Sequence, residues 1–242
     1  MVSVKDHSPR RPRREFRYDG LMTQELWTNV DTYITERVAP RDEDLEAAQK
    51  ASADAGLPAI SVSAAQGKML SLFATMIGAK RILEIGTLGG YSTLWLGWAL
   101  PLGGHITTLE ADPKHAEVAR ANIARAGLAD SVDVRVGKAL ETLPRIYDED
   151  APPFDMIFID ANKDQIPEYF QWALKLGHKG SLIVVDNVVR GGKILDGASA
   201  DANVQGVRRF YDMLAKETRV SATAIQTVGV KGYDGFALAV VL

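Results

Sequence analysis

Acidic and amide side chains follow two apolar segments of this sequence in a pattern that could bind a metal ion. Asp160 comes directly after residues 154–159, and Asp186 and Asn187 come directly after residues 181–185. If both segments are strands of a parallel sheet, their carboxyl ends meet at one edge and bring three oxygen ligands together. Two carboxylates and one amide oxygen suit a hard cation, most readily Mg²⁺, with Mn²⁺ or Ca²⁺ as alternatives. The spacing alone is equally consistent with side chains that merely cap turns and the helices after them.

A glycine-rich turn follows another short apolar segment, residues 81–85. The turn runs Gly86-Thr87-Leu88-Gly89-Gly90, and glycine lets a backbone turn sharply and approach a ligand closely. Glu110 ends the next predicted strand, 20 residues after Gly90, where an acidic side chain can accept both hydroxyls of a ribose. The turn and the acid together predict a nucleoside ligand without saying which one.

The spacing of these glycines separates two kinds of nucleoside ligand. Dinucleotide folds usually carry Gly-x-Gly-x-x-Gly, with a pyrophosphate at the helix N-terminus, whereas this chain has Gly86-x-x-Gly89-Gly90 preceded by Glu84. An acid facing the turn would repel a pyrophosphate, but it would tolerate or bind the cationic sulfonium and amino group of S-adenosylmethionine (SAM). The alternative for Glu84 is a carboxylate that caps nearby backbone N–H groups.

The elements that position these residues alternate between strands and helices. Strands are expected at 81–85, 105–109, 132–136, 154–159 and 181–185, with helices at 91–100, 113–126, 139–146, 166–176 and 204–217. This alternation predicts a doubly wound α/β fold, in which a parallel sheet has helices on both faces. Two closing strands, 222–228 and 235–241, are separated by only six residues, so we expect an antiparallel hairpin at one edge of a mostly parallel seven-stranded sheet.

Helical spacing dominates the first third of the chain and predicts an N-terminal helical extension. The three expected helices follow Leu26 to Val38, residues 45–55, and the segment after Ser63, a candidate N-cap. Residues 1–20 are rich in arginine and proline, and we expect a flexible basic arm there before a single domain over 21–242.

Composition narrows the environment and the partners. The net charge of −3 gives no basic field for nucleic acid or an anionic membrane, and no apolar run approaches the ~20 residues needed to cross a bilayer. The chain contains no cysteine, which excludes disulfides and thiolate metal sites and makes a reducing cytoplasm the expected location.

Four segments carry a resemblance to a known family: 60–67 (ISVSAAQG), 82–92 (ILEIGTLGGYS), 158–164 (FIDANKD) and 185–188 (VDNV). Taken together and in this order, they resemble the metal-dependent class I O-methyltransferases, typified by caffeoyl-CoA and catechol O-methyltransferases. The resemblance extends from about Leu26 to the end of the chain. It implies a Rossmann-like class I methyltransferase fold, SAM as the cofactor, and a homodimer.

The resemblance also implies roles for individual residues. Asp160, Asp186 and Asn187 would hold the divalent cation, and Lys163 would be the general base that takes the proton of the acceptor hydroxyl. Without the resemblance, Lys163 would be interpreted as a solvated loop cation. The implied SAM contacts are Val62, Glu84, Gly86, Ser92, Glu110, Gly137, Ala139 and Asp160.

One position departs from the family pattern, which often reads Asp-Ala-Asp-Lys where this chain has Asn162. We expect weaker contact to the cofactor ammonium there, because an amide oxygen accepts without carrying charge. Residues 203–211 lack the basic substrate-recognition stretch of the plant enzymes, so a coenzyme A ester is not inferred. The expected acceptor is a small catechol-like or hydroxycinnamoyl-like molecule. The alternatives are a dinucleotide-dependent oxidoreductase and a non-catalytic nucleoside-binding module.

Overall fold

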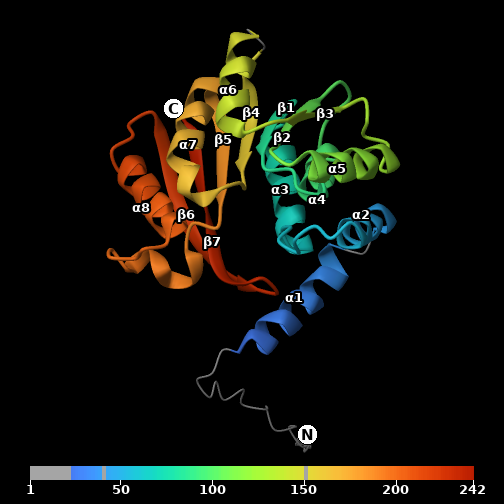
Figure 1. The fold of residues 1–242 in the computed structure, drawn as a ribbon, viewed down its shortest axis with the longest axis horizontal. Helices are drawn as coiled ribbons and strands as arrows, with labels where there is room; N and C mark the ends of the chain where they lie inside the picture. The colour runs from blue at the N-terminus through green and yellow to red at the C-terminus, as the bar shows by residue number, and fades with distance from the viewer. Residues whose placement is uncertain (1–22, 40–41, 150–151) are drawn as a thin grey trace, which may run out of the picture.

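Seven strands form one sheet in the order β3-β2-β1-β4-β5-β7-β6 (Figure 1). The computed structural model describes residues 23–39, 42–149 and 152–242. The strands are β1 (Arg81–Ile85), β2 (His105–Glu110), β3 (Val132–Val136), β4 (Phe154–Ile159), β5 (Gly177–Asp186), β6 (Val220–Gly229) and β7 (Gly232–Val241). The first five are parallel, and β7 runs antiparallel to both β5 and β6. The predicted mostly parallel sheet with a C-terminal hairpin is confirmed.

Helices cover both faces of the sheet. They are α1 (Gln24–Val38), α2 (Glu43–Asp54), α3 (Ala64–Met76), α4 (Tyr91–Gly97), α5 (Pro113–Arg125), α6 (Ala139–Asp148), α7 (Ile166–Leu176) and α8 (Ala202–Leu214), with the 3₁₀ helices η1 (Lys163–Gln165) and η2 (Arg190–Leu195). Figure 1 shows α6, α7 and α8 on one side of the sheet and α3, α4 and α5 on the other. Ser63 caps α3 as predicted, because its Oγ accepts from the Gln66 N–H at 3.2 Å.

Alternating side chains of the central strands build two separate hydrophobic cores. Ile82 and Leu182 pack on the side of α2 to α5, whereas their neighbours Leu83 and Ile183 pack on the side of α6 to α8. All four are buried, as the two-residue period of a strand between helical layers requires. The central strands are therefore held from both faces, and their carboxyl ends are fixed in space.

The closing hairpin is longer than the sequence pattern predicted. Pairing between β6 and β7 continues to Gly229 and Gly232, so only two residues form the turn where a loop over 230–234 was expected. Gly232 has a φ of +89°, a conformation that glycine adopts without steric cost. The helix expected over 91–100 is shorter than predicted and ends at Gly97.

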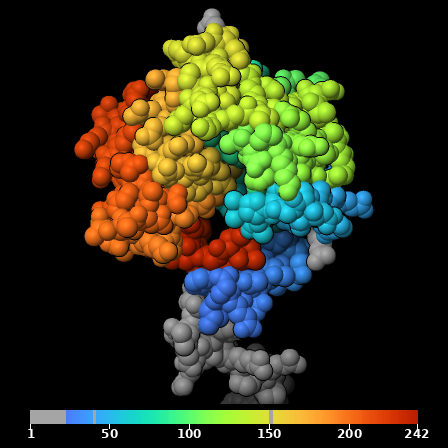
Figure 2. All heavy atoms as spheres, viewed as in Figure 1, coloured from blue at the N-terminus to red at the C-terminus, as the bar shows by residue number. Residues whose placement is uncertain are grey.

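Helix α1 lies at the edge of the domain, against the tip of this hairpin. None of its side chains is buried, and its apolar residues Leu26, Val30, Tyr33, Ile34 and Val38 are exposed. Figure 2 shows the hairpin (red) against α1 (blue). The expected arm over residues 1–20 lies outside the described residues. Among the helices that the structure describes, none is long and apolar enough to cross a membrane.

Candidate active site

The predicted metal ligands lie side by side at the carboxyl edge of the sheet. Ile159 of β4 pairs with Val185 of β5, so Asp160 and Asp186 leave neighbouring strands at the same level. Asn187 follows with a φ of +59°, in the left-handed region that asparagine tolerates better than most residues. The structure therefore brings these three residues together.

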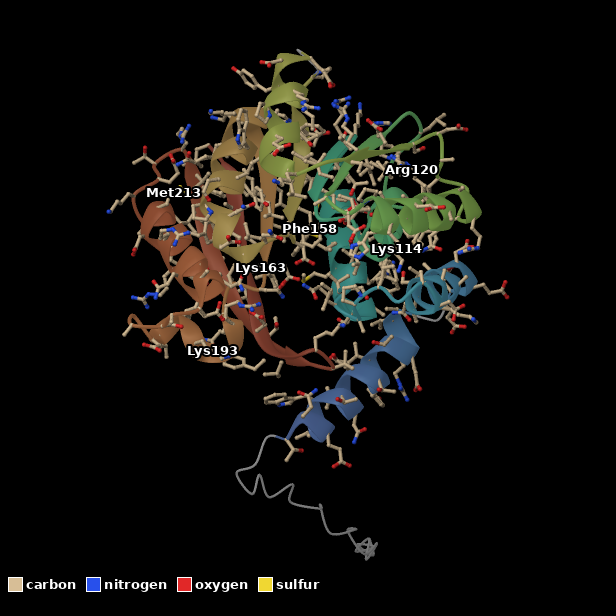
Figure 3. All side chains as sticks on the ribbon, in the orientation of Figure 1. Lys114, Arg120, Phe158, Lys163, Lys193 and Met213 are labelled. Carbon is tan, nitrogen blue, oxygen red and sulfur yellow. The ribbon has the colours of Figure 1, made fainter. Side chains whose placement is uncertain are left out.

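Negative charge at this edge is only partly balanced. Asp186 is 5% exposed, and burial together with the neighbouring Asp160 carboxylate raises its pKa well above the ordinary value. Lys163 Nζ lies 2.5 Å from Asp160 Oδ1, and in Figure 3 Lys163 lies below Phe158 of β4. Two carboxylates with one lysine form an oxygen-rich site that would gain from a cation, because isolated buried charges are costly.

The loop that carries Lys163 is fixed by α8. Arg209 donates from Nη2 to the Asp164 carbonyl at 2.8 Å. Gly206 of α8 lies so close that a Cβ there would overlap the carbonyl oxygen of Lys163. Gly206, 43 residues after Lys163 in the sequence, thus helps to set the position of the candidate base.

The glycine-rich turn after β1 touches the candidate metal site. Gly86 has a φ of +105°, and a Cβ there would overlap the backbone carbonyl oxygen of Asp160. Leu88 also has a positive φ, of 50°, which is strained for leucine. Its N–H donates to Glu110 Oε2 at 2.7 Å, while the Asp112 N–H donates to Oε1 at 2.9 Å. Glu110 thereby holds the turn in place and has one backbone partner on each oxygen.

Glu84 lies beneath this turn rather than on its surface. Its side chain is fully buried, and its oxygens accept from Ser92, Thr93 and Thr108 hydroxyls at 2.6, 2.5 and 2.7 Å. Burial raises the pKa of Glu84 to about 7. The alternative of a backbone N–H cap is wrong, because the partners are hydroxyl groups. The structure brings Glu84 and Ser92 together, and a contact of either with a cofactor stays a prediction.

The remaining predicted cofactor residues border the same edge. Gly137 follows β3, and its N–H donates to the Glu110 carbonyl at 2.8 Å. Ala139 begins α6 two residues later. Val62 is buried just before the cap of α3 and packs in the core on that side of the sheet. The turns after β1, β2 and β3 therefore adjoin one another, while Val62 approaches from a separate segment.

Two features of the site were missed by reasoning from the sequence. A cavity of about 240 Å³ opens on Asp186 and Asn187, with walls from α1, the start of α3 and the β6–β7 hairpin. Gln66 lines this cavity and donates from Nε2 to Asp186 Oδ2 at 2.8 Å. The Ser63-x-x-Gln66 pattern was a visible signal, but it indicates a local helix cap and not a contact 120 residues away.

Comparison with known proteins agrees with this geometry. A model of the O-methyltransferase family matches residues 35–240. The chain belongs to the O-methyltransferase family. Its enzyme class is therefore as the resemblance implied, an O-methyltransferase that uses SAM as the methyl donor, and the oxidoreductase and binding-module alternatives are wrong.

Individual relatives of this O-methyltransferase cover almost the whole chain. The catechol O-methyltransferase of Niastella koreensis is 55% identical over 220 residues, which is 91% of this chain and 100% of that protein. The O-methyltransferase from Bacillus cereus, solved in complex with SAH, has a TM-score of 0.90 at 55% identity and covers 91% of this chain and 100% of that one. TomG from Streptomyces achromogenes, involved in tomaymycin synthesis and solved in complex with SAM, has a TM-score of 0.88 at 52% identity and covers 91% and 99%.

Proposed function

We propose that this O-methyltransferase methylates one hydroxyl of a small catechol-like acceptor, with a divalent cation held by Asp160, Asp186 and Asn187. The observation that carries the proposal is the cavity that opens on Asp186 and Asn187. Its volume of about 240 Å³ lies just under the ~300–1,000 Å³ of typical small-molecule pockets. That size favours a single aromatic ring over a bulky ester. The name of the Niastella koreensis relative, a catechol O-methyltransferase, supports the same acceptor class.

The SAM site of the proposal follows the turns after β1, β2 and β3. Glu110 accepts from the ribose hydroxyls, Gly86 allows close backbone approach, and the buried Glu84 lies beneath the methionine end. Val62, Ser92, Gly137 and Ala139 complete the contacts, and Asp160 adjoins the turn through Gly86. Support comes from the relatives solved with SAH and with SAM.

The donor set fits a hard cation such as Mg²⁺ or Mn²⁺. Two carboxylates and an amide provide oxygen ligands alone, and the mutual repulsion of Asp160 and Asp186 is only partly offset by Lys163. Asp160, Asp186 and Asn187 would hold such a cation, which would supply the Lewis acidity that makes an acceptor hydroxyl more acidic.

The chemistry at the acceptor is a displacement at the methyl carbon. Lys163 takes the proton of the acceptor hydroxyl. The oxygen then bonds to the methyl carbon as the carbon–sulfur bond of SAM breaks, so the products are the methyl ether and SAH. The walls of the cavity hold the ring in line with the methyl group, and such orientation supplies up to ~7–11 kcal/mol in favourable systems.

The test is a methyl-transfer assay with catechol and with phenol, in excess chelator and after adding back Mg²⁺ or Mn²⁺. We expect methylation of catechol that disappears with chelator and returns with metal, and little methylation of phenol because it cannot chelate. Full turnover in excess chelator would contradict the metal requirement. Asp160, Asp186 and Asn187 would then serve only to cap turns and helices.

We also propose that the enzyme is a homodimer and that it is located in the cytoplasm. The exposed apolar side chains of α1, Leu26, Val30 and Ile34 among them, support a dimer because a second copy would cover them. Light scattering of the wild type and of Ile34→Lys tests this, with a dimer expected for the first and a weakened one for the second. A monomeric wild type would contradict it.

A further inference from the structure

Gln66 lies in the first turn of α3, yet its side chain contacts a candidate metal ligand that follows β5. Its Nε2 donates to Asp186 Oδ2 at 2.8 Å, and the Asn187 N–H donates to the other carboxylate oxygen at 2.7 Å. Each oxygen of this buried carboxylate therefore has one donor that fixes its orientation. A hydrogen bond to a charged group is among the stronger ones in proteins.

The turn of α3 that carries Gln66 is capped and closely packed. Ser63 caps the helix at the backbone N–H of Gln66. The next residue, Gly67, lies so close to α4 that a Cβ there would overlap the Trp95 ring. The start of α3 thus packs closely against α4, and the amide of Gln66 is presented to Asp186 from this closely packed turn.

A neutral donor suits this position better than a charged one. The amide orients the Asp186 carboxylate but leaves its negative charge in place, whereas a lysine would neutralise it and compete with a cation. Asp160, the neighbouring carboxylate, already has Lys163 as its cationic partner. Hydrogen-bond partners of metal ligands commonly orient the ligand and set the affinity of the site.

We propose that Gln66 is a positioning residue that holds Asp186 in its ligating orientation and thereby sets the metal affinity of the site. This inference rests on the proposed metal requirement. Gln66 also lines the acceptor cavity, so its loss would change acceptor binding as well. A test by activity alone could not separate the two effects, and metal binding without acceptor is the measurement needed.

The experiment compares Mn²⁺ binding to the full chain saturated with SAH, by calorimetry and by the electron paramagnetic resonance of free Mn²⁺. Gln66→Met keeps the length of the side chain and removes the amide, and Gln66→Ala is the second variant. Gln171→Met, on α7 and exposed, is the matched control. We expect both Gln66 variants to bind Mn²⁺ roughly 10–100-fold more weakly, and SAH within about twofold of the wild type.

The outcomes separate this role from a merely structural one. A lower melting temperature with unchanged Mn²⁺ affinity in both Gln66 variants would overturn the proposal, since packing alone would then explain Gln66. Wild-type affinity in Gln171→Met with weak binding in Gln66→Met would support it. If the wild type itself binds no Mn²⁺, the proposed metal requirement fails and the role of Gln66 fails with it.

Discussion

Lys163 Nζ lies 2.5 Å from Asp160 Oδ1, so the candidate general base forms an ion pair with a candidate metal ligand three residues earlier. Both side chains are largely buried, at 12% and 20% exposed. The pair links the charge of the candidate metal site to the position of the amine.

Replacement of Lys163 should slow the chemical step and spare cofactor binding. We expect Lys163→Ala to lower the turnover number by something like 10²–10⁴-fold, the usual contribution of a general base. SAM affinity should stay near the wild-type value, because the glycine turn and Glu110 lie on other loops. The Lys163→Arg variant distinguishes a role as a base from a role as a positive charge, because arginine can keep the ion pair but cannot lose its proton. An arginine variant with full turnover would show that Lys163 acts only as a cation.

Removal of the Glu110 carboxylate should weaken SAM binding by roughly 1.5–3 kcal/mol, as expected for hydrogen bonds to a charged group. The cause is twofold, because Glu110 also holds the N–H of Leu88 in its strained conformation. Calorimetry of Glu110→Ala measures the loss. Glu110→Gln keeps an acceptor oxygen and should lose less. If both variants bind SAM as tightly as the wild type, Glu110 does not bind the ribose.

The Glu84 carboxyl should make stability depend on pH. Its folded-state pKa of about 7 lies above the ordinary value of 4.5, so the native state keeps a proton that the unfolded chain has lost. Stability therefore falls as pH rises from about 4.5 through about 7, by about 3 kcal/mol at most. Glu84→Gln cannot lose this proton, and its stability relative to the wild type should rise between pH 5 and pH 8. Urea unfolding of both proteins at pH 5 and at pH 8 measures this difference in stability.

The control for this prediction is Glu117→Gln on the exposed face of α5. Its stability relative to the wild type should change little over the same interval. If Glu84→Gln and the wild type differ in unfolding free energy by the same amount at pH 5 and at pH 8, Glu84 must have the same pKa in the folded and unfolded chains.

A side chain at position 206 should displace Lys163. A Cβ on Gly206 would overlap the Lys163 carbonyl oxygen and the Asp164 backbone, so Gly206→Ala must move the loop. We expect a stability loss of about 1–3 kcal/mol, together with lower turnover. Gly97→Ala is the matched control, because its Cβ would meet the flexible Leu128 side chain in a remote part of the core. Equal turnover in the two variants would contradict the prediction.

The sequence could place the three candidate metal ligands near one another because strand ends are local signals. Asp160, Asp186 and Asn187 each follow an apolar strand, and parallel strands place their carboxyl ends at one edge without further information. The same reasoning placed Gly86 and Glu110 at this edge of the sheet, as the structure has them. These positions depend on topology, which the alternation of strands and helices indicated.

The partners of those residues depend on packing that no local pattern encodes. Gln66 reaches Asp186 only because Gly67 lets α3 approach α4, and its own spacing from Ser63 suggests a helix cap. Asp31 lines the acceptor cavity because the hairpin turn at Val230 is tight enough to meet α1. Each contact joins segments whose relative position is set by the whole fold.

Helix α1 is joined to the hairpin by a few polar contacts and by no buried side chain. Asp31 Oδ2 accepts from the Val230 N–H at 2.7 Å, and Gln24 Nε2 donates to the Gly229 carbonyl at 2.9 Å. Substitutions at the exposed positions of this helix therefore remove few packing contacts from the folded chain. A substitution at Asp31, the α1 residue that lines the cavity, can change the shape and charge of that wall without touching Asp160, Lys163 or Asp186. Asp31 is thus a position at which acceptor preference can diverge between descendants of this enzyme.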